Sequence, residues 1–380
     1  MKKCILWGTI LISASSMAMA SPFLALGDGA ELFLTGTGKV KFDDNVLSSP
    51  TKISDTIFVL SPGLEVTTGK NSQISTLLDC SEDVTRYDKT TSLNTNLAHV
   101  TFGANYLASK STVMINAGYN QNNQNTPTGT TVPGSIGAGL LRSNETNAGI
   151  SGETDLTQKT RVGLGFTYDK THYVNNPAGT VDDKIYTVPI DFYYEYTQKL
   201  SLLAGLRYRD TELAGLPGYK DYYYSVGARG DFTALISGTL GLGINERTTP
   251  GLANQSSFGL NSSLTYKASE KTKITLNLND DTGASSNGQS QEIISFSSRV
   301  DTDFDNAWKG FASVTYNNTK YKNAVPSRTD NYYEGDIGFT YVFSLKFNVT
   351  GTYSYKKNDS NAVAQSFNDN LISLAAVVRY

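Results

Sequence analysis

Long stretches of the chain alternate between apolar and polar residues with a period of two, and no other feature limits the fold as strongly. Between Tyr186 and Tyr196 every second residue is aromatic or aliphatic, whereas the residues between them are Thr, Pro, Asp, Tyr and Glu. A period of two places successive side chains on opposite faces of a β-strand. Similar rows recur from Leu32 to Tyr380, so we expect an all-β chain.

The position of the aromatic residues within these rows separates the possible β architectures. Rows such as 162–168 and 347–355 carry aromatics at one or both ends and aliphatic or small residues elsewhere. A soluble β-sandwich or solenoid has no reason for this arrangement, but a bilayer does, because Tyr and Trp prefer its two interfaces. No apolar run after residue 20 reaches the roughly 20 residues of a membrane helix. The pattern therefore favours an outer-membrane barrel.

The connections between the rows alternate in length, which predicts how the barrel is threaded. Short turns such as GKNS and ASKS alternate with long polar segments, expected to be loops, at 121–143, 170–183, 209–220, 280–290, 321–331 and 357–369. Short periplasmic turns and long extracellular loops are typical of bacterial barrels, whose sheet must close because lipid leaves no partner for a free edge. We expect one transmembrane antiparallel up-and-down β-barrel of about 18 strands over residues 30–380.

The first twenty residues have the anatomy of a cleaved secretory signal peptide. Lys2 and Lys3 precede a short apolar run, and Ala18-Met19-Ala20 fits a peptidase site. We therefore expect cleavage after residue 20 and a short periplasmic segment at 21–29. Without Lys2 and Lys3, 30 basic residues remain against 35 acidic ones, which argues against a nucleic-acid partner. Only Cys80 remains, so no internal disulfide is expected.

The last strand predicts how the protein is assembled. It ends on an aromatic residue preceded by an apolar row of alternate residues: Ile372, Leu374, Ala376, Val378 and Tyr380. This row resembles the signal that the barrel-assembly machinery reads in outer-membrane proteins. We expect this machinery, the lipid of the outer membrane and its lipopolysaccharide to be partners. The same strand is expected to close the barrel by pairing with residues near 30–42.

The stretch GKVKFDDNVLSSPTKISDTIFVLSPGLEVTTGKNSQISTLLDCSEDVTRYD resembles the opening of the putative beta-barrel porin type-2 family. The positions that carry this resemblance are Phe42, Asp43, Asp44, Asn45, Val46, Ser54, Asp55, Pro62, Gly63 and Tyr87. Members of that family are similar to proteins found in exopolysaccharide-secretion clusters. The resemblance therefore implies a barrel at the cell outer membrane and polysaccharide as a possible partner.

If the aromatic rows face lipid, the polar rows face the lumen of a barrel large enough to hold an aqueous channel. The candidate pore-lining residues are Asp191, Tyr193, Glu195, Arg207, Arg209, Tyr223, Arg229, Asp231, Arg299 and Asp301. Acids and bases on neighbouring strands are expected to pair. Such a ladder is either a scaffold that holds the lumen open or a transverse field that orients a solute. Because the charges have mixed signs, strong ion selectivity is not predicted.

We therefore expect a passive or weakly selective conduit for hydrophilic solutes, with carbohydrate or exported exopolysaccharide as the main candidate. The alternative is a structural or adhesive barrel whose lumen is closed and whose loops carry the function. In loop 121–143, Ile136, Leu140 and Leu141 either narrow the channel or extend a flanking strand.

No enzymatic activity, cofactor or metal site is predicted. The chain has only two histidines, His99 and His172, and no nucleophile motif that either could serve. The acid pairs 43/44, 182/183 and 280/281 lack the graded spacing of a calcium loop, so they are expected to form turns.

Overall fold

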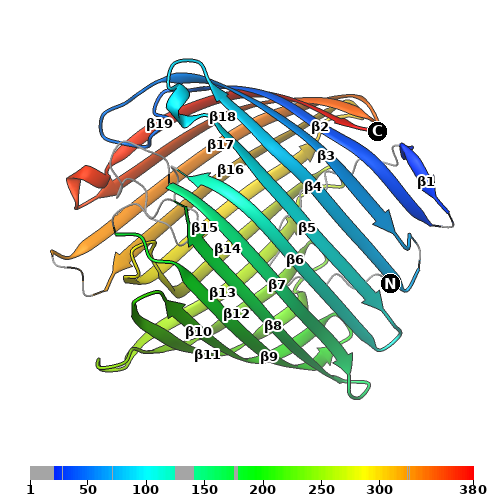
Figure 1. Cartoon of the computed structure of the whole chain (residues 1–380). Coiled ribbons are helices and arrows are strands. Elements are labelled where there is room, and N and C mark those ends of the chain that lie inside the picture. Colours follow the sequence, from blue (N-terminus) through cyan, green and yellow to red (C-terminus); the bar gives the residue numbers. More distant parts are fainter. Residues whose placement is uncertain are drawn as a thin grey trace.

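The structure, a computed structural model, describes residues 21–27, 29–70, 72–124, 141–174, 179–322, 324 and 326–380. Nearly all of them belong to one closed antiparallel β-barrel (Figure 1). The strands are β1 (Leu24–Leu26), β2 (Ala30–Asp43), β3 (Asp55–Thr68), β4 (Ile74–Tyr87), β5 (Thr95–Leu107), β6 (Ser111–Gln124), β7 (Leu141–Asp155), β8 (Thr160–Tyr173), β9 (Asp183–Thr197), β10 (Leu200–Leu213), β11 (Leu216–Asp231), β12 (Ile236–Thr248), β13 (Gln255–Lys267), β14 (Thr272–Ala284), β15 (Ser290–Asp303), β16 (Trp308–Tyr321), β17 (Arg328–Ser344), β18 (Phe347–Ser360) and β19 (Phe367–Arg379). Two short 3₁₀ turns lie at Thr91–Leu93 and Val363–Gln365, and no helix in these described ranges has the length and hydropathy to cross a bilayer.

The barrel closes where its first and last long strands meet. Each strand from β2 onward pairs with the next, and β19 pairs back onto β2 with Ile372 opposite Phe42 and Val378 opposite Gly36. This confirms the predicted 18-stranded up-and-down barrel. The expected N-terminal segment 21–29 contains β1, which extends the sheet by pairing with the start of β2.

Strand parity places the apolar rows on the outside and the charged rows on the inner face. On β10 the alternating residues Leu202 and Leu206 are exposed, whereas Arg207 and Arg209 of the opposite parity are shielded. Aromatic contacts gather near both ends of the strands. Trp308, Tyr341 and Phe343 make edge-to-face contacts near one end, and Tyr208 packs on Tyr222 toward the other. Two aromatic levels are what the two interfaces of a bilayer require.

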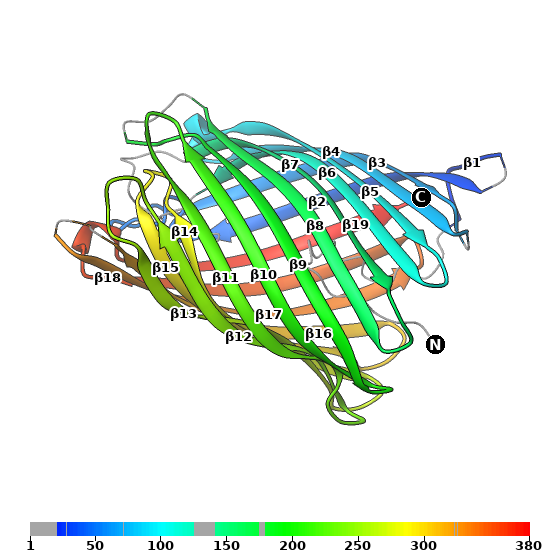
Figure 2. The ribbon, with the colours of Figure 1, turned by 90° about the horizontal axis from the view of Figure 1, so that it is seen from below.

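The first long strand, β2, starts at the same rim of the barrel at which the last strand, β19, ends (Figures 1 and 2). We call this rim the terminal end. All connections at this rim are short, such as 108–110 and 198–199. The opposite rim, the loop end, carries the longer connections, such as 44–54 and 88–94.

Several segments expected to be loops are largely strand. Of 209–220, only Ala214 and Gly215 connect β10 to β11, and β14 continues through Ala284. Beyond the lipid neither face of a strand must be apolar, so the alternation fades although the backbone ladder continues. Sequence patterning therefore marks the end of the apolar band and underestimates the length of the strand.

Candidate functional site

Five charged residues form a buried ion-pair cluster toward the loop end on the inner face of β10–β14. Asp221 accepts hydrogen bonds from Arg247 at 2.6 and 2.8 Å and from Arg209 at 3.0 Å. Asp281 contacts Arg207 at 2.7 Å and Arg209 at 3.2 Å. We call these five residues the Asp221 cluster. Arg207 and Asp281 lie on strands four apart in the sheet, so the two side chains meet over the inner face of the barrel.

The centre of this cluster is almost completely removed from solvent. Arg247 and Asp221 are each 2% exposed. The remaining donors of Arg247 reach the Gly283 carbonyl at 2.6 Å and Ser290 Oγ at 2.7 Å, and its guanidinium lies 4.5 Å from the Tyr219 ring centroid. Buried charges are tolerated when paired and fully hydrogen-bonded, so this arrangement can hold its geometry.

Tyr223 lies next to the Asp221 cluster and uses space that two glycines provide. Arg207 stands 5.0 Å from its ring centroid. A Cβ at Gly243 or at Gly259 would come within 2.7 or 2.5 Å of the Tyr223 ring. The glycines thus allow the ring to lie flat along the wall, where a larger residue would push it inward.

A second group of charges, the Glu153 cluster, lies toward the terminal end. Glu153 pairs with Arg229 at 2.7 Å and with Arg161 at 3.5 Å, and Arg161 also contacts Asp155 at 2.7 Å. Arg229 covers the ring of Tyr193, 3.8 Å from its centroid. Asp191 also belongs to the cluster, because it is buried on the same strand as Tyr193 and interacts electrostatically with Glu153 and Arg229. The members are therefore Glu153, Asp155, Arg161, Asp191, Tyr193 and Arg229.

A cavity of about 560 Å³ opens beside this cluster at the terminal end. Glu195 and Asp231, both among the candidate pore-lining residues, line it together with Lys159, Lys199 and Lys267. Arg299 and Asp301 lie elsewhere: they pair with each other at 2.9 Å on β15, and Arg299 covers Phe311. Eight of the ten candidates therefore lie on β9–β11, in or beside the two clusters and the cavity, and two do not.

Some members of the clusters were not predicted from the sequence. Glu153, Asp221 and Arg247 carry central contacts although they were not among the candidates. The expectation that Asp280 and Asp281 form a turn is wrong, because both lie in β14 and Asp281 binds two arginines. Strand parity with Asn277 and Asn279 was the available signal for Asp281, since polar residues at alternate positions mark an inner face.

The residues that carry the family resemblance build the loop end of the closing strands. Asp43 Oδ1 accepts a hydrogen bond from Asn45 N at 2.7 Å. The Asn45 side chain donates to the Ser49 and Asn368 carbonyls, both at 2.8 Å, and thereby ties loop 44–54 to β19. Asp43 is the last residue of β2, and Asp44 begins the connection as expected of a turn residue.

Asp55 and Pro62 have separate structural roles on β3. Asp55 is fully buried and accepts hydrogen bonds from the backbone of Thr56 at 2.7 Å, Lys89 at 3.0 Å and Thr90 at 2.7 Å. It therefore anchors the connection 88–94 to the start of β3. Pro62 stands opposite Gly36 at a break in the β3–β4 pairing, where its missing N–H costs no ladder bond.

The two histidines have acidic partners on neighbouring segments. His99 lies 3.6 Å from Asp83 and 3.2 Å from Asn120, and His172 lies 2.6 Å from Asp182 in the connection before β9. Asp83 is distant from His99 in sequence and reaches it because β4 pairs with β5.

Most of loop 121–143 lies outside the described residues. Residues 121–124 belong to β6, and Leu141 is the buried first residue of β7, so at these positions the segment extends strands. Ile136 and Leu140 lie outside the described residues.

The predicted assembly signal forms the outward face of β19. Ile372, Leu374, Val378 and Tyr380 are exposed, and Tyr380 exchanges backbone hydrogen bonds with Leu34 at 2.7 and 2.8 Å. Its ring meets Phe23 and Lys346. Recognition of this strand by the assembly machinery stays a prediction.

Comparison with known families decides the class of this barrel. Residues 35–380 match the family described as Putative beta-barrel porin 2. The chain belongs to this family. The protein is accordingly a porin of the outer membrane, as the sequence predicted, and the family and channel fold are typical of transport proteins rather than enzymes.

Solved structures share the fold of this porin at low sequence identity. The outer membrane protein opdK from Pseudomonas aeruginosa aligns with a TM-score of 0.50 and 13% identity over 93% of this chain and 100% of that one. Pseudomonas aeruginosa OccK2 (OpdF), in complex with glucuronate, aligns with a TM-score of 0.50 and 14% identity over 92% and 98%. A comparison with curated proteins found no match. At these identities the likeness concerns the fold alone.

Proposed function

We propose that this porin is a passive, weakly selective conduit for small hydrophilic solutes, with neutral carbohydrates as the leading substrate class. The observation that carries the proposal is the balance of charge on the inner face of β7–β14. The two clusters together hold five arginines, namely Arg161, Arg207, Arg209, Arg229 and Arg247. They also hold five carboxylates, namely Glu153, Asp155, Asp191, Asp221 and Asp281. A wall of this kind is polar but almost neutral, so a strong preference for either ion sign is not expected.

The balance is not uniform along the wall. The Asp221 cluster has three arginines for two carboxylates, whereas the Glu153 cluster has two arginines for three carboxylates. A solute would meet a slight positive excess toward the loop end, which we assign to the outside, and a slight negative excess toward the periplasm. The polar side chains of the two clusters suit a hydroxylated solute, and the opposite charge excess of the two clusters suits a small dipolar one.

The test is conductance of the refolded porin in a planar bilayer, followed by liposome swelling in neutral sugars. A steady open current, a cation-to-anion permeability ratio near one and swelling in mono- and disaccharides are expected. Arg207→Gln should shift the permeability ratio toward cations, because it leaves the cluster with equal charges. The matched control is Arg86→Gln, because Arg86 is exposed and shares the outward parity of Ile74 and Leu78 on β4, away from the inner face.

Two outcomes would contradict the proposal. A folded barrel without current would support the alternative of a closed structural or adhesive barrel. A strong ion preference would contradict weak selectivity. Export of exopolysaccharide has no support from the described contacts or from the comparisons and stays a prediction. The absence of enzymatic activity also stays a prediction. His99 lies 3.6 Å from Asp83 and 3.2 Å from Asn120, and no contact among the described residues brings a nucleophile to it.

A further inference from the structure

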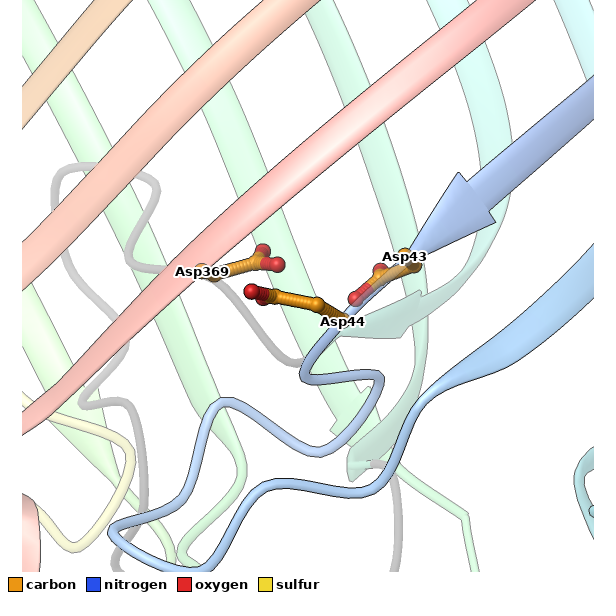
Figure 3. A group of neighbouring side chains, drawn as sticks. All are labelled: Asp43, Asp44 and Asp369. Carbon is orange, nitrogen blue, oxygen red and sulfur yellow. The ribbon is translucent and has the colours of Figure 1, made fainter.

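Three carboxylates meet at the loop end of the seam between β2 and β19. Asp43 ends β2, Asp44 follows it, and Asp369 lies near the start of β19, 326 positions later. Each offers a carboxylate oxygen, and these oxygens lie within 4.8 Å of one another. Figure 3 shows the three side chains pointing toward a common centre.

This group differs from an ordinary cluster of surface acids in its burial. Asp43 is 3% exposed and Asp369 is 2% exposed. Oδ1 of Asp369 is buried and has no hydrogen-bond partner in the part of the chain that the structure describes. An unpartnered oxygen of a buried acid is costly, so the group needs either a proton or a cation.

Neighbouring cations do not neutralise the two buried acids directly. Lys52 pairs with Asp44 at 2.8 Å, and Asn370 donates to both Asp44 oxygens. Lys356 stands opposite Asp369 in the β18–β19 register. No lysine or arginine within the described ranges forms an ion pair within 4.0 Å of Asp43 or Asp369.

We propose that Asp43, Asp44 and Asp369 bind a calcium ion that fastens the closing seam of the barrel at the cell surface. The donor set contains only carboxylate oxygens, which suit calcium, magnesium and manganese better than zinc or copper, whose protein sites usually include His or Cys. Calcium accepts irregular oxygen geometry and completes its six to eight ligands with water or carbonyls, whereas magnesium demands a near-ideal octahedron. The three ligands come from a strand end, a loop and a distant strand, which is an irregular set.

The scaffold around the site is prepared without the ion. Asn45 ties the loop to the Asn368 carbonyl, and Asp44 is fixed to the backbone of Asn370 at 2.7 Å. These bonds hold the first and last strands in place, so the chelating oxygens are positioned before a cation arrives. The inference is independent of what the channel carries.

The experiment uses the porin refolded from Ser21 onward in a zwitterionic detergent and stripped with a chelator. Titration with CaCl2 in a calorimeter should show one saturable site with half-saturation between about 10⁻⁴ and 10⁻³ M, the range of extracellular calcium modules. Millimolar CaCl2 should also raise the urea midpoint of unfolding. Sodium chloride at the same ionic strength should give neither effect.

Three variants locate the site. Asp369→Asn and Asp43→Asn should each weaken calcium binding about tenfold or more and remove the calcium-dependent shift of the midpoint. Asp359→Asn is the matched control, because Asp359 is an exposed acid at the same end and pairs with Lys357; it should bind calcium like the parent. Heat-modifiable mobility on a gel checks that each variant is folded.

The outcomes divide clearly. The proposal is overturned if the parent shows no saturable heat of calcium binding. It is also overturned if Asp43→Asn and Asp369→Asn bind calcium as tightly as the parent and the control. In the first case the two buried acids share a proton instead, and in the second the ion binds elsewhere. Titration of the parent alone is sufficient to overturn the proposal, even if a variant fails to fold.

Discussion

The Asp221 cluster and the Asp43/Asp44/Asp369 group are both buried acids near the loop end, but the barrel neutralises them differently. Asp221 has an arginine at 2.6 Å and another at 3.0 Å. Asp43 and Asp369 instead face each other, and one oxygen of Asp369 has no partner among the described residues. The first cluster contains its own counter-charges, so it is a self-sufficient scaffold. The second is complete only with a proton or a cation from outside.

The largest expected effect comes from breaking the self-sufficient cluster. Arg247→Met removes a guanidinium that is 2% exposed and leaves Asp221 with Arg209 alone. Removing one partner of a buried pair costs about 3–5 kcal/mol, because the remaining charge stays desolvated. Urea unfolding of the refolded porin should show this loss in the free energy of unfolding. A loss below about 1 kcal/mol would mean that water reaches the cluster.

A direct comparison of the two sites uses the same substitution in each. Asp221→Asn should destabilise the barrel by about 3 kcal/mol, because the buried Arg247 loses its counter-charge and Arg209 keeps only Asp281. Asp369→Asn, measured with a chelator present, should instead stabilise it by about 1 kcal/mol, since the amide can donate to a neighbouring carboxylate and the repulsion disappears. Equal signs for the two substitutions would remove the distinction between the sites.

The outer edge of the Asp221 cluster should tolerate change better than its centre. Arg207 is partly exposed and shares Asp281 with Arg209, so Arg207→Gln leaves Asp281 paired. We expect a loss of about 1.5 kcal/mol in the free energy of unfolding, the lower end of the range for one hydrogen bond between charged groups, because Arg207 is partly exposed. A loss as large as that of Arg247→Met would show that the five residues act as one unit, and a double-mutant cycle would measure their coupling.

The smallest effect is expected at an exposed acid outside the barrel wall. Asp182 lies in the connection before β9; burial raises its pKa, but hydrogen bonds from His172 and from Tyr173 N outweigh this and hold the pKa below its usual value. A depressed pKa stabilises the fold above the unfolded pKa of about 3.9, and this contribution is lost as pH falls through the folded value. Because the pair is exposed, the contribution should be about 0.5 kcal/mol or less.

Asp182→Asn should therefore be slightly less stable than the parent at pH 7, and the difference should be smaller at pH 3, as the carboxylate of the parent protonates. Urea unfolding at both pH values measures it. A difference that persists unchanged at low pH would assign the effect to packing rather than to the carboxylate.

Much of the fold followed from local patterning. The apolar rows predicted the strands, their outward faces and the pairing of residues 372–380 with β2, because facing lipid imposes a period of two over the whole apolar band. The ends of the strands were underestimated at 209–220 and 280–290, since polar residues pair into the ladder beyond the bilayer without leaving a pattern. Eight of the candidates chosen by parity lie in or beside the two clusters and the cavity, but their partners Glu153, Asp221 and Arg247 were not among the candidates.

The sequence by itself determined which face of each strand meets lipid, because that property repeats every two residues and depends on each residue's own chemistry. Only the tertiary structure decided which charge meets which. Arg207 reaches Asp281 across three intervening strands, and Asp369 reaches Asp43 only because the sheet closes on itself. Such contacts depend on the tilt, register and closure of the entire barrel, and no local pattern encodes them. The paired wall and the acidic seam therefore become distinguishable only in the folded barrel.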